Sequence, residues 1–139
     1  PFPNGKRWQK NPDPATDGTY GVLNAIDLNG RKVVWSTRTR GAFVSAALAT
    51  GGGLIFAGTV DRRFKAFDAK SGAELWDTGV DNSPASFPVT YAVDGRQYVA
   101  VATNEGFVHT QAMAQVMKLR MPPNGGATLW VFALPTKTR

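Results

Sequence analysis

The 139-residue sequence contains no cysteine and only one histidine, His109. The absence of cysteine excludes disulfides, thiolate metal sites, a cysteine nucleophile and covalent haem attachment through a C-x-x-C-H motif. A zinc cluster or a Ser-His-Asp triad would need several groups to converge on His109, and no partner motif surrounds it. We therefore expect His109 to be a loop or surface residue.

Long apolar runs are also missing. No stretch approaches the roughly 18 uninterrupted apolar residues of a membrane helix, and Pro1-Phe2-Pro3 does not open a signal peptide. With 42% hydrophobic residues, the chain still has enough apolar material for a core. We expect a soluble chain with no transmembrane segment. Because its first residue is not methionine, we also expect it to be part of something longer.

The charge is basic but not concentrated. Sixteen basic and ten acidic side chains give a net charge of +6, and the basic residues are scattered among apparent strands and turns. Nucleic-acid binding normally places such residues in one patch or stripe. The distribution predicts a solvated surface and no nucleic-acid partner, with enough positive charge to steer an acidic partner protein.

The hydrophobic pattern predicts an all-β chain. Residues 1–18 are rich in proline and glycine and read as an extended loop. From Thr19 onward, short β-branched or aromatic runs alternate with turn signals such as Asn29-Gly30, Lys70-Ser71-Gly72 and Asp94-Gly95. FVSAALAT, at 43–50, is one of these runs. Residues 104–127 lack the pattern and are expected to form a long surface excursion with one helical turn or two.

An internal repeat refines this prediction. Ala25, Asp27 and Trp35 recur 41 residues later as Ala66, Asp68 and Trp76. A period near 40 with several strands per copy is typical of β-propeller blades. A small alanine leaves room for a flat indole, aspartate and Gly72 suit a tight turn, and the buried indole N–H needs an acceptor. We interpret the repeats as blade-to-blade fastenings; two unrelated hairpins with similar turns are the alternative.

The chain is then a partial propeller over residues 1–139. We predict a blade at 19–50 with its motif at 25–35, a blade at 51–90 with its motif at 66–76, and a closing blade at 91–135 that carries the 104–127 excursion. About three blades do not close a ring, since propellers have about four to eight. The chain must either assemble with itself or complete a larger propeller.

The ordered motifs carry a family resemblance. AFDAKSGAELW resembles the tryptophan-docking motif of pyrroloquinoline quinone (PQQ) dependent dehydrogenases. The series ATGGGLIFAGTVDRRFKAFDAKSGAELW, PASFPVTYAVDGRQYVAVAT and LWVFALP resembles the C-terminal end of the alcohol and glucose dehydrogenases of that family. A non-catalytic propeller scaffold of the kind used in outer-membrane protein assembly shares the docking repeat and is the rival reading.

The resemblance implies an eight-bladed periplasmic propeller that holds PQQ beside a calcium or lanthanide ion. An aspartate base and the ion would assist hydride transfer from an alcohol or sugar carbon to the quinone, and a cytochrome or quinone would accept the electrons. The family's catalytic and metal-binding residues lie upstream of the matched region. We therefore expect no catalytic or metal-ligating residue here, and the remaining N-terminal propeller as a partner.

Two stretches match positions that face the cofactor in the family. Val44 and Ser45 replace a tryptophan and a glycine that precede the glycine-led strand. Asn104, Glu105 and Gly106 stand where the family usually has a glycine-rich stretch after the QYVAV strand. We expect these five residues to contact PQQ, and the missing tryptophan argues against a preference for methanol. Ala25, Asp27, Trp35, Ala66, Asp68, Gly72 and Trp76 are expected to be structural.

Overall fold

The computed structural model describes residues 18–104, 108–120 and 126–134. Its strands are β1 (Gly21–Asp27), β2 (Lys32–Thr39), β3 (Leu48–Ala49), β4 (Leu54–Thr59), β5 (Arg63–Asp68), β6 (Glu74–Gly79), β7 (Val89–Val93), β8 (Arg96–Thr103) and β9 (Thr128–Ala133), and helix α1 is Val108–Val116. All strand pairs are antiparallel. The predicted all-β class is confirmed, with α1 as the single helix of the described residues.

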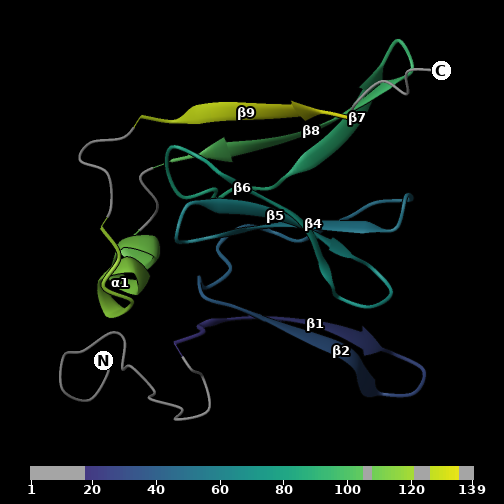
Figure 1. Cartoon of the computed structure of the whole chain (residues 1–139), viewed down its shortest axis with the longest axis horizontal. Helices are drawn as coiled ribbons and strands as arrows, with labels where there is room; N and C mark the ends of the chain where they lie inside the picture. The colour runs from purple at the N-terminus through teal and green to yellow at the C-terminus, as the bar shows by residue number, and fades with distance from the viewer. Residues whose placement is uncertain (1–17, 105–107, 121–125, 135–139) are drawn as a thin grey trace.

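The strands form three sheets that lie one above another, with α1 to one side of them (Figure 1). The first sheet has the order β1-β2, the middle sheet β3-β4-β5-β6 and the third sheet β7-β8-β9. The middle sheet is therefore the only one of the three that has a neighbour on each face among the described residues. Successive sheets along the chain are neighbours in space, as blades of a propeller are.

The run at 43–50 does not form the continuous strand expected from its sequence. The N–H groups of Val44 and Ser45 donate to the Gly58 carbonyl, whereas the N–H of Ala46 donates to Ser86. Because these acceptors lie in two separate segments, a regular ladder cannot continue through the run. Only β3 forms, and it pairs with β4. Residues 48–49, expected in the 19–50 blade, thus belong to the middle sheet.

Helix α1 occupies part of the predicted excursion at 104–127. The helix contains His109, for which we expected a loop or surface position. It ends where Lys118 takes a positive φ of 55°, and Leu119 and Lys118 donate to the carbonyls of Ala114 and Gln115. This double hydrogen bond is a Schellman ending, which usually has glycine at the left-handed position.

The internal repeat is reproduced in the strand pairing. Ala25 lies opposite Trp35 in the first sheet, and Ala66 lies opposite Trp76 in the middle sheet. In both sheets the register shifts immediately after the alanine, so the second strand carries one extra residue, as a β-bulge does. The two hairpins thus share their turn, their alanine–tryptophan pair and their irregularity.

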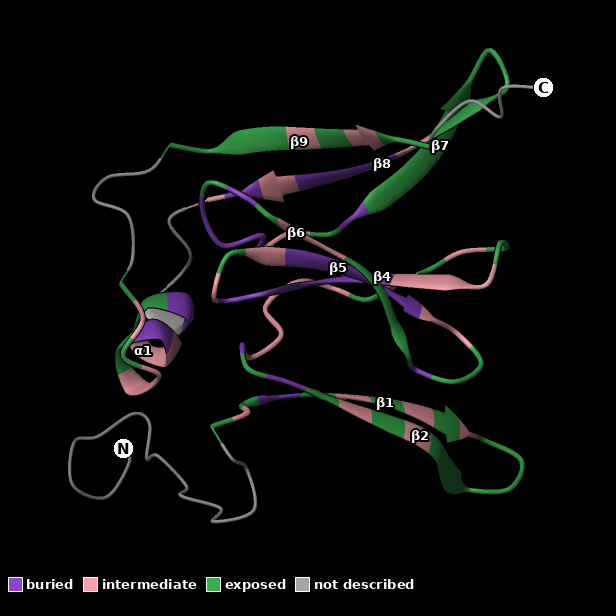
Figure 2. Ribbon diagram, viewed as in Figure 1, coloured by how far each residue is buried: buried purple, intermediate pink, exposed green. Residues whose placement is uncertain are grey.

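The core lies between the middle and third sheets. Phe56, Phe64 and Ala66 of the middle sheet pack with Val99 and Val101 of β8, and Phe64 is completely buried. Burial of one such side chain contributes roughly 2–3 kcal/mol. Figure 2 shows buried residues along the middle sheet and β8, and largely exposed ones on β7 and β9.

Candidate functional site

The tryptophan of the first sheet contacts the turn of the middle sheet. Trp35 donates from Nε1 to the carbonyl of Ala69 over 3.1 Å. Two residues further on, the Thr37 hydroxyl donates to the carbonyl of Gly72 over 2.6 Å. A Cβ on Gly72 would lie 2.4 Å from Trp35 Cε3. The indole therefore lies directly on the backbone of the turn, and its partly buried N–H has an acceptor.

Asp68 shapes the turn that Trp35 contacts. Its Oδ1 accepts hydrogen bonds from the Lys70 N–H, the Ser71 N–H and the Ser71 hydroxyl. These bonds, the Ser71 hydroxyl first, lower the pKa of Asp68. Gly72 closes the turn at a φ of 72°.

The equivalent turn of the first sheet is less complete. Asp27 accepts one hydrogen bond, from the Asn29 N–H, and Arg31 stands at the position of Gly72 with a φ of 49°. Both aspartates accept hydrogen bonds from their own turns, in keeping with the structural role that the sequence predicts for them.

The second junction of sheets is aromatic. Trp76 lies edge to face with Phe64 and with Phe132 of β9, at centroid distances of 6.2 and 5.1 Å. Phe64 also stacks on Phe132. Trp76 remains 38% exposed. Trp76 thus contacts the next sheet by packing, whereas Trp35 does so by packing and a hydrogen bond.

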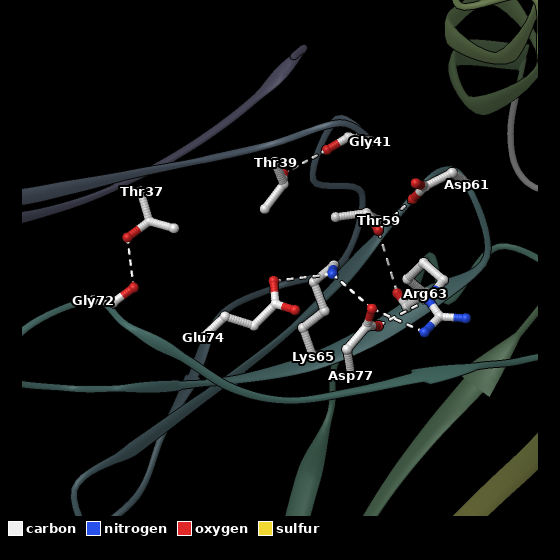
Figure 3. Close-up of polar contacts among 10 residues, drawn as sticks. All are labelled: Thr37, Thr39, Gly41, Thr59, Asp61, Arg63, Lys65, Gly72, Glu74 and Asp77. Carbon is white, nitrogen blue, oxygen red and sulfur yellow. Dashed lines mark hydrogen bonds and ion pairs between the residues drawn. The ribbon is translucent and has the colours of Figure 1, made fainter. Parts of the chain in front are cut away.

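A charged group lies on the face of the middle sheet that looks toward the first (Figure 3). Lys65 contacts Glu74 and Asp77, each at 3.0 Å, and Arg63 binds Asp77 through Nε and Nη2, each at 2.8 Å. Burial works against the charge of Asp77, but Arg63 and Lys65 outweigh it and lower its pKa. Each of these four charged side chains has a partner within the group. The group therefore stabilises the sheet and leaves no unpaired charge to bind a ligand.

The two predicted cofactor-facing stretches are brought to one region. Val44 and Ser45 are half-buried and bond to Gly58 at the end of β4, where the Ser45 hydroxyl accepts from the Gly58 N–H at 2.7 Å. A Cβ on Gly58 would lie 2.4 Å from Pro84. The segment that holds Pro84 also binds Asn104, whose N–H donates to the Ser83 carbonyl at 3.1 Å. Residues 82–86 thus link the two stretches.

The remaining predicted contacts are more limited. Asn104 is half-buried, and its side-chain amide donates to the carbonyl of Ala85 at 3.5 Å. Glu105 and Gly106 lie outside the described residues. The assignment of PQQ contacts to these five residues stays a prediction.

Local sequence gives no signal for the contribution of Asp81. Asp81 lies in a loop, and it accepts hydrogen bonds from Thr103, Thr128 and Trp130. Partial desolvation opposes its ionisation, but these bonds outweigh that cost and lower the pKa of Asp81 to about 2. Trp130 is half-buried, and its indole N–H donates to this carboxylate.

A metal site and a membrane-spanning helix each place requirements on the described residues. Across residues 18–104, 108–120 and 126–134, no group of three or more His, Asp or Glu side chains could hold a metal ion. The helix in the same residues is too short to span a membrane.

Comparison with known proteins decides the family. The model of the glucose, ethanol and alcohol dehydrogenase β-propeller domain, named PQQ, matches residues 3–99. The chain belongs to the PQQ-dependent dehydrogenase family. Over 120 residues it is 39% identical to the quinoprotein ethanol dehydrogenase of Pseudomonas aeruginosa. This match covers 86% of the chain and 19% of that relative. It thus spans about a fifth of the relatives' length.

Solved structures of PQQ-dependent dehydrogenases share the fold. The quinohemoprotein alcohol dehydrogenase of Comamonas testosteroni superposes on the chain with a TM-score of 0.71 at 33% sequence identity. The match covers 85% of this chain and 17% of the Comamonas chain. A europium-containing methanol dehydrogenase gives a TM-score of 0.71 at 30% sequence identity, and the match covers 85% of this chain and 24% of the methanol dehydrogenase chain. BamB of Moraxella catarrhalis gives a TM-score of 0.50 at 20% sequence identity, and the match covers 60% of this chain and 24% of the BamB chain. This similarity shows a shared fold alone. The predicted propeller architecture is confirmed.

Proposed function

We propose that this chain forms the C-terminal blades of a PQQ-dependent dehydrogenase that oxidises an alcohol or sugar hydroxyl, and that it supplies part of the wall around the cofactor. One observation carries the proposal. Asn104 is far in sequence from Val44 and Ser45, but Ser83 and Pro84 link it to them at the same ends of β4 and β8. In a propeller, loops at one end of neighbouring blades surround the central axis.

The chemistry of these residues suits one side of a flat, polar cofactor. Val44 is a half-buried apolar side chain that can pack against a ring, and the Asn104 amide can donate to a carboxylate. The hydrogen bond from the Asn104 side-chain amide to the Ala85 carbonyl is long, at 3.5 Å. When bound, PQQ would supply the quinone that accepts hydride. The chain's own residues would orient it and exclude water.

The catalytic base and the ligands of a calcium or lanthanide ion are proposed to lie outside this chain. The described residues contain no cluster with the donors such an ion requires. Asp27 and Asp68 hold their own turns, which leaves neither available as a base. We therefore propose that the chain by itself is inactive.

The outer sheets support the proposal that more propeller blades flank this chain. Val22, Ile26, Val33 and Val34 of the first sheet are about half exposed, as are Val89, Tyr91, Val93, Leu129 and Val131 of the third. Apolar residues on both faces of a strand are typical of a sheet covered on both sides. The repeated tryptophans would then act as docking residues between successive blades.

The acceptor and the compartment are proposed by analogy with relatives. Two relatives from Thauera butanivorans are named 1-butanol dehydrogenase, one with quinone and one with cytochrome c. We propose a cytochrome or a quinone as the electron acceptor here, and the periplasm as the location. The basic surface, with a net charge of +6, favours an acidic acceptor protein.

The test uses the full-length protein that contains this chain. It is reconstituted with PQQ and with either Ca²⁺ or a lanthanide, and dye reduction is followed with ethanol, 1-butanol and glucose. We expect bound PQQ by mass and absorbance, and turnover with at least one substrate. A correctly folded protein that binds no PQQ would refute the proposal and leave a non-catalytic propeller scaffold.

A further inference from the structure

Asp81 joins the two strand ends that flank the 104–127 segment. It lies in the connection between β6 and β7, and its Oδ1 accepts from the Thr103 hydroxyl and the Trp130 indole N–H, each at 2.7 Å. Its Oδ2 accepts from the Thr128 hydroxyl at 2.5 Å. Thr103 is the last residue of β8 and Thr128 the first of β9. One carboxylate therefore holds the point where the segment leaves the third sheet and the point where it returns.

The same connection holds Asn104. The Asn104 N–H donates to the Ser83 carbonyl at 3.1 Å and its side-chain amide to the Ala85 carbonyl at 3.5 Å. Ser83 is fully buried, and its hydroxyl donates to the Val60 carbonyl. The segment from Asp81 to Ala85 is therefore anchored to the middle sheet and holds Thr103 and Asn104 in successive positions.

A carboxylate suits this role better than a neutral side chain. All three of its side-chain donors are neutral groups from the third sheet, and hydrogen bonds to a charged acceptor are about twice as strong as neutral ones. An asparagine could present only one acceptor oxygen, so it could not accept from both Thr103 and Thr128 with separate atoms. The arrangement therefore depends on both carboxylate oxygens.

We propose that Asp81 is a positioning residue, whose carboxylate ties the ends of β8 and β9 together and so fixes Asn104 at the candidate site. Its effect on PQQ rests on the proposed function. Its effect on the strand ends does not depend on that function.

The experiment compares three variants of the full-length protein by hydrogen exchange. Asp81→Asn removes one acceptor oxygen, and Thr128→Val removes one of the two hydrogen bonds between Asp81 and β9 while the bond from Trp130 remains. Asp94→Asn is the control, because Asp94 is an exposed carboxylate in the β7–β8 turn and asparagine tolerates its φ of 49°. We expect the amides of Thr103 and Asn104 to exchange roughly tenfold faster in Asp81→Asn. Those of β4 and β5 should not change, and the control should match the wild type.

PQQ affinity gives the second readout. Asp81→Asn should weaken PQQ binding, and the loss should largely disappear when Asn104 is already alanine, because residues that act through one another are not additive. A general loss of packing would instead add to the effect of Asn104→Ala. If the wild type does not bind PQQ but Asp81→Asn still shows the faster amide exchange, the role of Asp81 at the strand ends is supported and the proposed function is refuted.

Unchanged exchange at Thr103 and Asn104 in both Asp81→Asn and Thr128→Val would overturn the proposal. If Asp81→Asn unfolds the protein, Thr128→Val decides, since it keeps the carboxylate and two of its three bonds. If Asp81→Asn weakens PQQ binding equally with and without the Asn104 side chain, only the proposed link between Asp81 and PQQ is overturned.

Discussion

Gly72 occupies a position that suits glycine for two independent reasons. Its φ of 72° is strained for any residue with a side chain. Its missing Cβ also leaves the space that the Trp35 indole fills, since an added Cβ would lie 2.4 Å from Cε3. One small residue thus sets both the turn of the middle sheet and its contact with the first sheet.

Gly72→Ala should therefore destabilise the protein more than a substitution that causes backbone strain alone. Gly95 is the matched control, because its φ is 74° and a Cβ there would meet nothing within 4 Å. We expect about 1–2 kcal/mol for the strain at either position, and about 1–3 kcal/mol more at Gly72 for the displaced indole. Urea unfolding of the two variants measures the difference, and equal losses would contradict the contact.

The pKa of Asp81 makes a pH prediction. Because its pKa is lowered to about 2, its ionised form stabilises the folded state above the ordinary pKa near 3.8. That contribution is lost as the pH falls from about 4 to about 2. The unfolding free energy of the wild type should decrease more steeply across this range than that of Asp81→Asn. Denaturant titrations over the range test this, and parallel curves would count against the three hydrogen bonds.

At the scale of elements, β5 and β6 are joined by charge as well as by backbone bonds. The Lys65 side chain is only 10% exposed, and it neutralises Glu74 and Asp77 across the strand pair. Removal of one partner from such a group leaves charges without compensation.

Lys65→Met should destabilise the middle sheet by about 1–3 kcal/mol, less than for a fully buried pair because Glu74 and Asp77 are partly exposed. Lys70→Met is the control, since Lys70 is an exposed turn residue outside this group. Thermal unfolding of both variants gives the comparison. A stability for Lys65→Met equal to that of Lys70→Met would show that apolar packing replaces the ion pairs.

The sequence predicts elements well where the signal is local. Hairpin turns such as Asp94-Gly95 and the alanine–tryptophan pairs follow from neighbouring residues and from the repeat. The sequence predicts helix α1 only in part, because the helix has no acidic residue in its first turn and no basic residue in its last. Its ending uses Lys118 at a left-handed position where glycine would have been recognised.

The candidate site shows the same division. Val44, Ser45 and Asn104 could be proposed from motif order, but the link through Ser83 and Pro84 could not, since it joins segments distant in sequence. Asp81 was overlooked because its donors are 22, 47 and 49 residues away. No local pattern marks a carboxylate whose partners meet it only in the folded chain.

At the scale of the whole molecule, the two outer sheets differ from the middle one. Both faces of the middle sheet are covered, whereas β1, β2, β7 and β9 expose apolar side chains (Figure 2). Their exposure predicts a contrast between the 139-residue chain and the full-length protein.

In the isolated chain, we expect the amides of β9 to exchange quickly, because β9 is an edge strand of the third sheet. In the full-length protein, we expect at least roughly tenfold slower exchange there, as a further strand pairs with it. The amides of β4 and β5 serve as the internal reference. Similar exchange in both forms would argue against completion of this sheet by other parts of the propeller.

The two repeated tryptophans lie at different junctions, and this gives the molecule two separate optical reporters. Trp35 lies at the junction of the first and middle sheets, where its indole N–H donates to the carbonyl of Ala69. Trp76 lies among the rings between the middle and third sheets and is partly open to solvent. The chain has four tryptophans, so in a background with Trp8 and Trp130 changed to phenylalanine, replacement of Trp35 or Trp76 leaves one indole whose emission reports its own junction. Unfolding followed in the two variants would then reveal whether the sheets separate together or in sequence.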